Sequence, residues 1–186
     1  ESLTNGISTS QIDIISAESC MEFYTTHTDY ETLAVRIILN DMDKTYKNTF
    51  SDCMAEINDT KRLCLAFYET VKLYQLSFNK MVCQNEDNDL SFFGLKTLIN
   101  NKYLMLDTNG RTCEKPCYMW LRVAIGVHLH LVDMLSSSDF LYKVNNTYKM
   151  LQKRLYTHAT PTLFNAGTSN PQFASCFLMS LNDDSV

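Results

Sequence analysis

Cys176 is the side chain whose type and setting best suit covalent or redox chemistry. It lies in the middle of an apolar run, residues 172–179 (QFASCFLM). A thiol can act as a nucleophile, a redox group or a metal ligand, although a cysteine among apolar neighbours is more often a small buried hydrophobic residue. Taken alone, the run leaves both roles open for Cys176.

Two further positions near the C-terminus could contact a ligand. Thr160 precedes Pro161, and proline is tolerated in the first turn of a helix, so a short helix is expected to begin here and to stop near Gly167. A hydroxyl beside free backbone N–H groups suits an anion, and an N-cap role for Thr160 is compatible with that. The cluster Asp183, Asp184 and Ser185 indicates, on its own, a solvated turn after a strand.

A metal site is not predicted. Cys113 and Cys117 are separated by three residues, which is not the spacing of a zinc-knuckle pair, and no second cysteine pair follows. His128 and His130 cannot face the same way on one helical turn, so one is expected in the core and the other at the surface.

The C-terminal region also carries a long motif without gaps. Residues 157–168 read THATPTLFNAGT, residues 171–178 fit PQ-x-x-SCFL, and residues 183–185 read DDS. This motif resembles the large, catalytic subunit of class I ribonucleotide reductase, and residues 93–98 (FGLKTL) resemble another segment of that family. The resemblance is closest over residues 90–186, looser over 25–57 and weakest over 58–89.

The resemblance implies specific roles for five residues. Cys176 matches one of the two thiols that reduce the ribose 2′ position. Thr160 and Ser175 match positions close to the substrate's diphosphate and ribose, although regular strand alternation would aim Ser175 away from Cys176. Asp184 and Ser185 match the deoxynucleotide (dNTP) specificity site. The partner thiol and the radical cysteine of the family have no counterpart that can be placed in this sequence.

The implied reaction converts ribonucleoside diphosphates to 2′-deoxyribonucleoside diphosphates by thiyl-radical chemistry. The family needs no covalently bound cofactor in this subunit. A small subunit supplies the radical, a thioredoxin- or glutaredoxin-type dithiol re-reduces the disulfide, and dNTP or ATP effectors with Mg regulate a homodimer of large subunits. The segment alone is expected to be inactive. The alternative is a non-catalytic helical scaffold derived from such a subunit, which binds other proteins.

Composition limits the class of protein. The 186 residues have a net charge of −5 and no large basic cluster, which argues against a nucleic-acid polymer or an anionic membrane as partner. No apolar run approaches the roughly 20 residues that span a bilayer. Seven cysteines, an odd number spread along the chain, indicate a reducing compartment rather than a disulfide scaffold, and a cytoplasmic location is expected.

The elements that must position these residues are mainly helical. Apolar spacing and caps predict a hairpin at 103–114 around an Asn-Gly turn, and a strand at 173–179 that is buried on both faces, as in a parallel sheet or barrel. The family assigns this strand to the start of a ten-stranded α/β barrel. The expected domains are a remnant of an ATP-cone-like helical region (1–45), to which no ATP site is assigned, the helical domain (46–170) and the start of the barrel (171–186). Helices are expected over residues 8–25, 28–47, 48–57 (a shorter one), 63–81, 90–100, 118–131 and 139–157.

Overall fold

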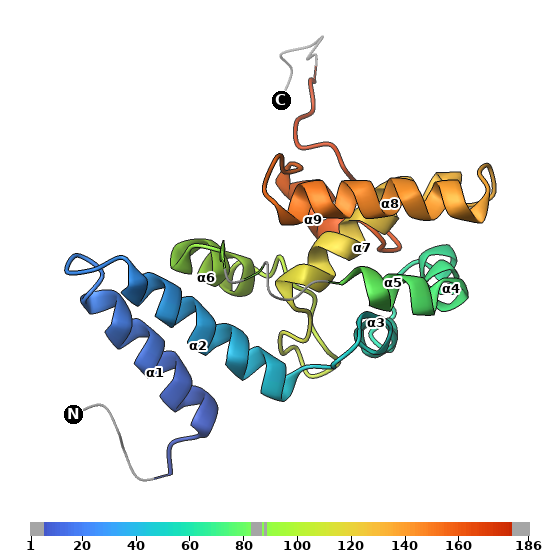
Figure 1. The fold of residues 1–186 in the computed structure, drawn as a ribbon. Coiled ribbons are helices and arrows are strands. Elements are labelled where there is room, and N and C mark those ends of the chain that lie inside the picture. Colours follow the sequence, from blue (N-terminus) through green and yellow to red (C-terminus); the bar gives the residue numbers. More distant parts are fainter. Residues whose placement is uncertain (1–5, 83–86, 88, 180–186) are drawn as a thin grey trace, which may run out of the picture.

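The computed structural model describes residues 6–82, 87 and 89–179, and this part of the chain is helical (Figure 1). None of the described helices is both long enough and apolar enough to cross a membrane. The helices are α1 (Thr9–Glu22), α2 (Asp29–Thr45), α3 (Phe50–Asn58), α4 (Leu65–Leu73), α5 (Gln75–Met81), α6 (Phe92–Asn100), α7 (Pro116–His128), η2 (Leu129–Leu131, one 3₁₀ turn), α8 (Ser137–Gln152) and α9 (Thr160–Asn165).

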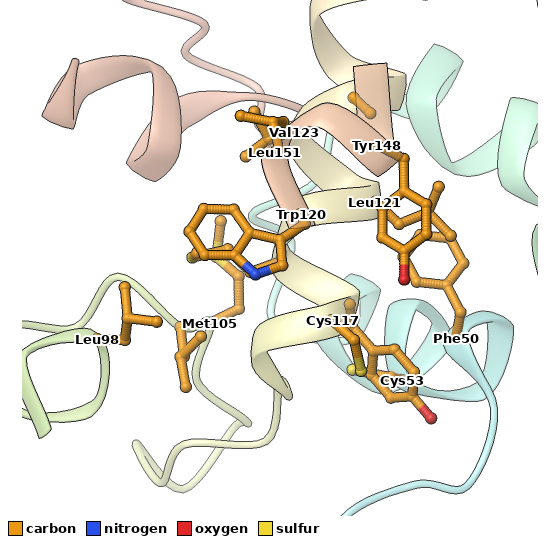
Figure 2. Close-up of a cluster of buried hydrophobic side chains, with 14 of the residues drawn as sticks. Phe50, Cys53, Leu98, Met105, Cys117, Trp120, Leu121, Val123, Tyr148 and Leu151 are labelled. Carbon is orange, nitrogen blue, oxygen red and sulfur yellow. The ribbon is translucent and has the colours of Figure 1, made fainter. Parts of the chain in front are cut away.

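Helix α7 forms the centre of the core. Ten consecutive residues, 116–125, are buried, so the helix is covered on all sides. It packs against α8 and contacts α9. Figure 2 shows Trp120 and Leu121 of α7 among buried side chains that come from α3, α6 and α8. The proline at its first position is the residue that a helix start accepts without losing a hydrogen bond.

Serine and threonine caps fix where several helices begin. Ser8 and Gln11 form a capping box at the start of α1. In the same way Thr49, Ser91 and Ser136 each accept a hydrogen bond from the backbone N–H three residues later, at the starts of α3, α6 and α8. These side chains satisfy donors that have no partner within a helix, so local sequence alone determines these boundaries.

Helix α1 lies beside α2 at the edge of the molecule (Figure 1). Ala17 is its one fully buried residue. Two ion pairs add to its attachment: Asp13 pairs with Lys44 of α2, and Glu18 pairs with Lys96 of α6, each at 2.9 Å. Cys20 and Met21 also pack against the core, so α1 is held by apolar contacts as well as by these partly exposed pairs.

Two expected helices differ from the structure. The helix expected over 63–81 is divided into α4 and α5 at Tyr74, whose ring contacts Phe140 of α8 with centroids 5.5 Å apart. The helix expected over 139–157 ends at Gln152, and Arg154 has a φ of 55°. Leu155, which lies within the expected helix, is consequently outside α8 and exposed.

Both expected β elements are reduced or absent in the described residues. At the expected hairpin the chain reverses at 107–110, but Leu106 and Thr112 form an isolated antiparallel bridge instead of two strands. Residues 173–179 form no strand, and Leu178 is fully exposed. A doubly buried strand needs neighbouring strands on both edges and layers on both faces, and the described residues provide neither.

Candidate functional site

The site region is built around α9, near the end of the described chain. The extended residue before the helix is Ala159, so Thr160 is the first helical residue, and the alternative of an N-cap role for Thr160 is wrong. Its hydroxyl lies 3.0 Å from the hydroxyl of Tyr103 and forms a hydrogen bond with it. The Tyr103 ring stacks on Phe164, with centroids 4.4 Å apart. Thr160 is therefore anchored through an aromatic pair, although it remains exposed.

A groove of about 770 Å³ runs along α9. Thr160 lies at its border, and Ala174, two residues before Cys176, is another of its lining residues. Lys61, Arg62 and Lys102 also line it, and no acidic residue does so among the described residues. Because three cationic side chains border one groove, it is suited to an anionic ligand.

Cys176 and Ser175 lie beyond this groove. Both are exposed, and the Ser175 hydroxyl lies 3.8 Å from the Cys176 sulfur. Of the cysteines that the structure describes, Cys176 is the one classed as exposed, and all six are free thiols. The structure thus makes the Cys176 thiol accessible, contrary to the buried position expected from the apolar run.

The chain between α9 and Cys176 is fixed by backbone contacts. The N–H of Cys64 donates to the carbonyl of Gly167 at 3.0 Å, and the N–H of Ser169 donates to the carbonyl of Arg62 at 2.9 Å. The Asn165 side chain then donates to the carbonyl of Gln172 at 2.7 Å. Gly167 has a φ of 83°, which a residue with a Cβ rarely adopts, so this turn requires glycine.

The described residues do not bring the expected site residues together at one point. Thr160 borders the groove with Gln172 and Ala174, whereas Ser175 and Cys176, which are neighbours in sequence, lie beyond it. Asp184 and Ser185 lie outside the described residues, so their expected place at an effector site has no structural counterpart.

Among the other cysteines and histidines, Cys53, Cys113 and His128 have hydrogen-bond partners within the fold. Cys53 and Cys113 direct their thiols at backbone carbonyls 3.5 Å away, and burial raises the pKa of Cys117 well above its usual range. His128 Nε2 lies 2.7 Å from the Thr147 hydroxyl, and burial lowers the pKa of His128, while His130 is exposed. Among residues 6–82, 87 and 89–179 no group of three or more potential metal ligands is arranged around one point.

Sequence reasoning missed Tyr103 and the buried ion pair of Arg122 and Glu114. Arg122 Nε lies 2.7 Å from a carboxylate oxygen of Glu114, and both side chains are 0% exposed. A signal was available, because Arg122 interrupts a strongly apolar helix, and an arginine there is costly unless it is paired. The groups that Arg122 contacts at the end of α9 are set by the tertiary fold, and no local pattern in the sequence indicates them.

Comparison with known proteins shows which proteins this chain is similar to. A family model described as "Ribonucleotide reductase, all-alpha domain" matches residues 88–171. The chain is 34% identical over 191 residues to ribonucleoside-diphosphate reductase large chain 2 of Saccharomyces cerevisiae, which covers 98% of this chain and 21% of the yeast protein. It is 32% identical to the large subunit of Danio rerio (100% of this chain, 23% of that protein) and 33% identical to that of Arabidopsis thaliana (97% and 22%).

All three relatives are named as large chains or large subunits of ribonucleoside-diphosphate reductase, and the similarity to each of them extends over nearly the whole chain. The chain spans between a fifth and a quarter of their length. By sequence, the chain belongs to the family of ribonucleoside-diphosphate reductase large subunits, of which it spans one segment.

Proposed function

We propose that this chain is the part of a reductase large subunit that presents the substrate's diphosphate side and one reducing thiol to the reaction. The observation that carries the proposal is the cationic groove along α9, which adjoins the segment bearing the exposed Cys176 thiol. A nucleoside diphosphate offers an anionic group for Lys61, Arg62 and Lys102, and the Thr160 hydroxyl is a suitable donor to a phosphate oxygen.

The proposed chemistry is reduction of the ribose C2′–OH bond. Two thiols supply two electrons and two protons, the 2′-hydroxyl leaves as water, and the two sulfurs join as a disulfide. Cys176 is proposed as one of these thiols, and Ser175 as a contact to the ribose. The second thiol, the radical cysteine and a small subunit that supplies the radical belong to other parts of the assembly in this proposal.

The proposal also includes regulation and reactivation. Asp184 and Ser185 are proposed to contact a dNTP effector, with the aspartate accepting a hydrogen bond from the deoxyribose 3′-hydroxyl. A thioredoxin- or glutaredoxin-type dithiol would reduce the disulfide after each turnover, and large subunits would pair as a homodimer. Relatedness to large subunits supports a small-subunit partner in general terms.

The test compares two cysteine variants of a full-length large subunit that carries this sequence. With the small subunit present, Cys176→Ser should abolish dithiol-dependent formation of deoxynucleotide, because one of the two reducing thiols is lost. Cys64→Ser is the matched control: the Cys64 sulfur accepts the Phe67 N–H at the start of α4, a role that serine also fills.

Normal turnover by Cys176→Ser would refute the role of Cys176. The 186-residue chain alone should form no deoxynucleotide with dithiothreitol, since it lacks an assigned second thiol. If the full-length protein also formed none while folding and binding its partners, the alternative of a non-catalytic helical scaffold would be favoured.

A further inference from the structure

Arg122 joins three parts of the fold through its guanidinium group. Its Nε and Nη2 donate to the two carboxylate oxygens of Glu114 at 2.7 and 3.0 Å. Its Nη1 donates to the carbonyls of Leu163 and Ala166 at 3.2 and 2.9 Å. Arg122 and Glu114 are both fully buried, so these bonds form away from water.

The two carbonyls belong to the C-terminal end of α9. Carbonyls at a helix end lack donors within the helix, and a cation there also interacts favourably with the helix dipole. With six residues, α9 is too short to be stable by itself. Its C-terminal end is thus held by a side chain of α7.

Gly126 brings the same face of α7 against the turn that follows α9. It lies four residues after Arg122, on the same side of the helix. A Cβ added at Gly126 would lie 2.5 Å from the nitrogen of Gly167 and 2.8 Å from the carbonyl carbon of Ala166. The backbones of α7 and of residues 166–167 are in direct contact here. Arg122 and Gly126 together form the part of α7 against which residues 163–167, the α9 corner, pack.

The ion pair also fixes the segment that holds Thr160. Glu114 accepts a hydrogen bond from the backbone N–H of Met105 at 2.9 Å, and Arg122 donates to the carbonyl of Tyr103 at 3.4 Å. The hydroxyl of Tyr103 in turn bonds to Thr160. Both ends of α9 therefore depend on the same buried pair.

We propose that Arg122 is a positioning residue, which sets the placement of Thr160 relative to the Cys176 segment through the α9 corner. The corner leads to Cys176 by way of Gln172, whose carbonyl is bonded to Asn165 of α9. This proposal rests on the function proposed above. Arg122 contacts no substrate in it, because its guanidinium group is fully buried.

The kinetic test uses Arg122→Gln, Arg122→Lys and Gly126→Ala in a full-length large subunit that carries this sequence. Misplacement by about 1 Å costs roughly 100-fold in rate, so Arg122→Gln and Gly126→Ala should lower kcat by about 10- to 100-fold. KM should change by less than about threefold, because the binding groups themselves remain. Arg122→Lys should recover part of kcat, since it keeps the charge but loses the planar fork.

Lys149→Gln is the matched control, because it removes a positive charge from an exposed position on α8. It should leave both kcat and KM unchanged. A raised KM with unchanged kcat in Gly126→Ala would overturn the proposal, as would wild-type kcat in Arg122→Gln.

Hydrogen exchange supplies a readout that does not require reductase activity. In the 186-residue chain, Arg122→Gln and Gly126→Ala should increase amide exchange at the α9 corner and at Ser169, while the protection of α8 stays as in the wild type. Unchanged exchange at the corner in Gly126→Ala would refute the positioning role even if Arg122→Gln failed to fold. If the wild-type full-length protein reduced no nucleotide, the function proposed above would fail, and the exchange result would still decide whether Arg122 holds the corner.

Discussion

At the scale of single residues, buried polar groups show what the sequence can and cannot predict. The position of Arg122 within an apolar helix is visible in the sequence, and it predicts a buried anionic partner. Its partner Glu114 lies eight residues earlier, and the same guanidinium reaches Ala166, 44 residues later, at the end of α9. Both contacts follow from tertiary packing. Nothing in the sequence indicates that Asp87 is buried, since it lies in a polar, acidic stretch that favours a solvated loop.

Asp87 has an unusual protonation equilibrium. It is 3% exposed and accepts the Cys117 backbone N–H at 2.9 Å, in the first turn of α7. Its Oδ1 has no hydrogen-bond partner among the described residues. Burial raises the pKa of Asp87 from 3.8 to about 7. Between these two values the folded chain holds a proton that the unfolded chain has lost.

This difference predicts a pH dependence of stability. Because the folded state binds more protons, the free energy of unfolding should fall as pH rises from about 4 to about 7. Asp87→Asn keeps an acceptor oxygen but carries no charge, so it should lose that slope. Its stability relative to the wild type should increase by on the order of 4 kcal/mol between about pH 4 and pH 7.5, measured by urea denaturation.

Asp89→Asn provides the control, because Asp89 is an exposed carboxylate from the same loop. It should leave the pH dependence of the wild type in place. Parallel curves of stability against pH for the wild type and Asp87→Asn would show that the buried carboxyl does not titrate in this range.

At the scale of elements, helix caps could be predicted from the sequence, whereas the break within a helix could not. Ser8 and Ser136 begin helices because their side chains satisfy backbone donors next to them. The break at Tyr74 has another cause: its ring packs against Phe78 and Phe140, and its hydroxyl donates to Ser137 at 3.0 Å. Tertiary packing overrides a continuous helical pattern there, and local sequence carries no mark of it.

The helix break at Tyr74 predicts that two neighbouring substitutions change the free energy of unfolding by unequal amounts. Tyr74→Ala removes the ring contacts to α5 and α8 and should lower the free energy of unfolding by about 2 kcal/mol, below the range for a fully buried aromatic residue because Tyr74 is half-buried. Leu76→Ala, on a side chain that is 77% exposed, should change it by less than about 0.5 kcal/mol. Equal shifts of the urea midpoint in the two variants would contradict a packing origin for the break.

At the scale of the whole molecule, the helical fold class could be predicted from the sequence, whereas the groove on the surface could not. Long amphipathic patterns require a helical core. The groove along α9, in contrast, is formed by residues near 61, 102, 160 and 170, which no local pattern brings together. The same limit explains the error at 173–179: the run is apolar enough for a barrel strand, but pairing depends on strands that the described residues do not include.

The exposed apolar end predicts self-association. Phe177, Leu178 and Met179 are 70%, 102% and 79% exposed, and apolar extended segments recruit one another. A chain ending at Gln172 keeps the bond to Asn165 and should scatter less light at high concentration than the 186-residue chain. Serine substitutions at Leu73 and Leu76, two exposed leucines near the α4–α5 junction, serve as the control for removing apolar surface in general. If they reduced scattering as much as the truncation, association would not be specific to the C-terminal segment.

The way α1 is attached gives the molecule an uneven response to ionic strength. Dissolved ions screen exposed charge pairs over about 8–10 Å, but they do not enter a pair that is fully buried. The links from α1 to Lys44 and Lys96 lie at the surface, whereas the pair of Arg122 and Glu114 has no exposed area. Added salt should therefore weaken these two links of α1, by about 1 kcal/mol or less each, while its apolar contacts and the α9 corner stay in place. The stability of the edge of this fold would then depend on the concentration of a simple electrolyte, and that of its centre would not.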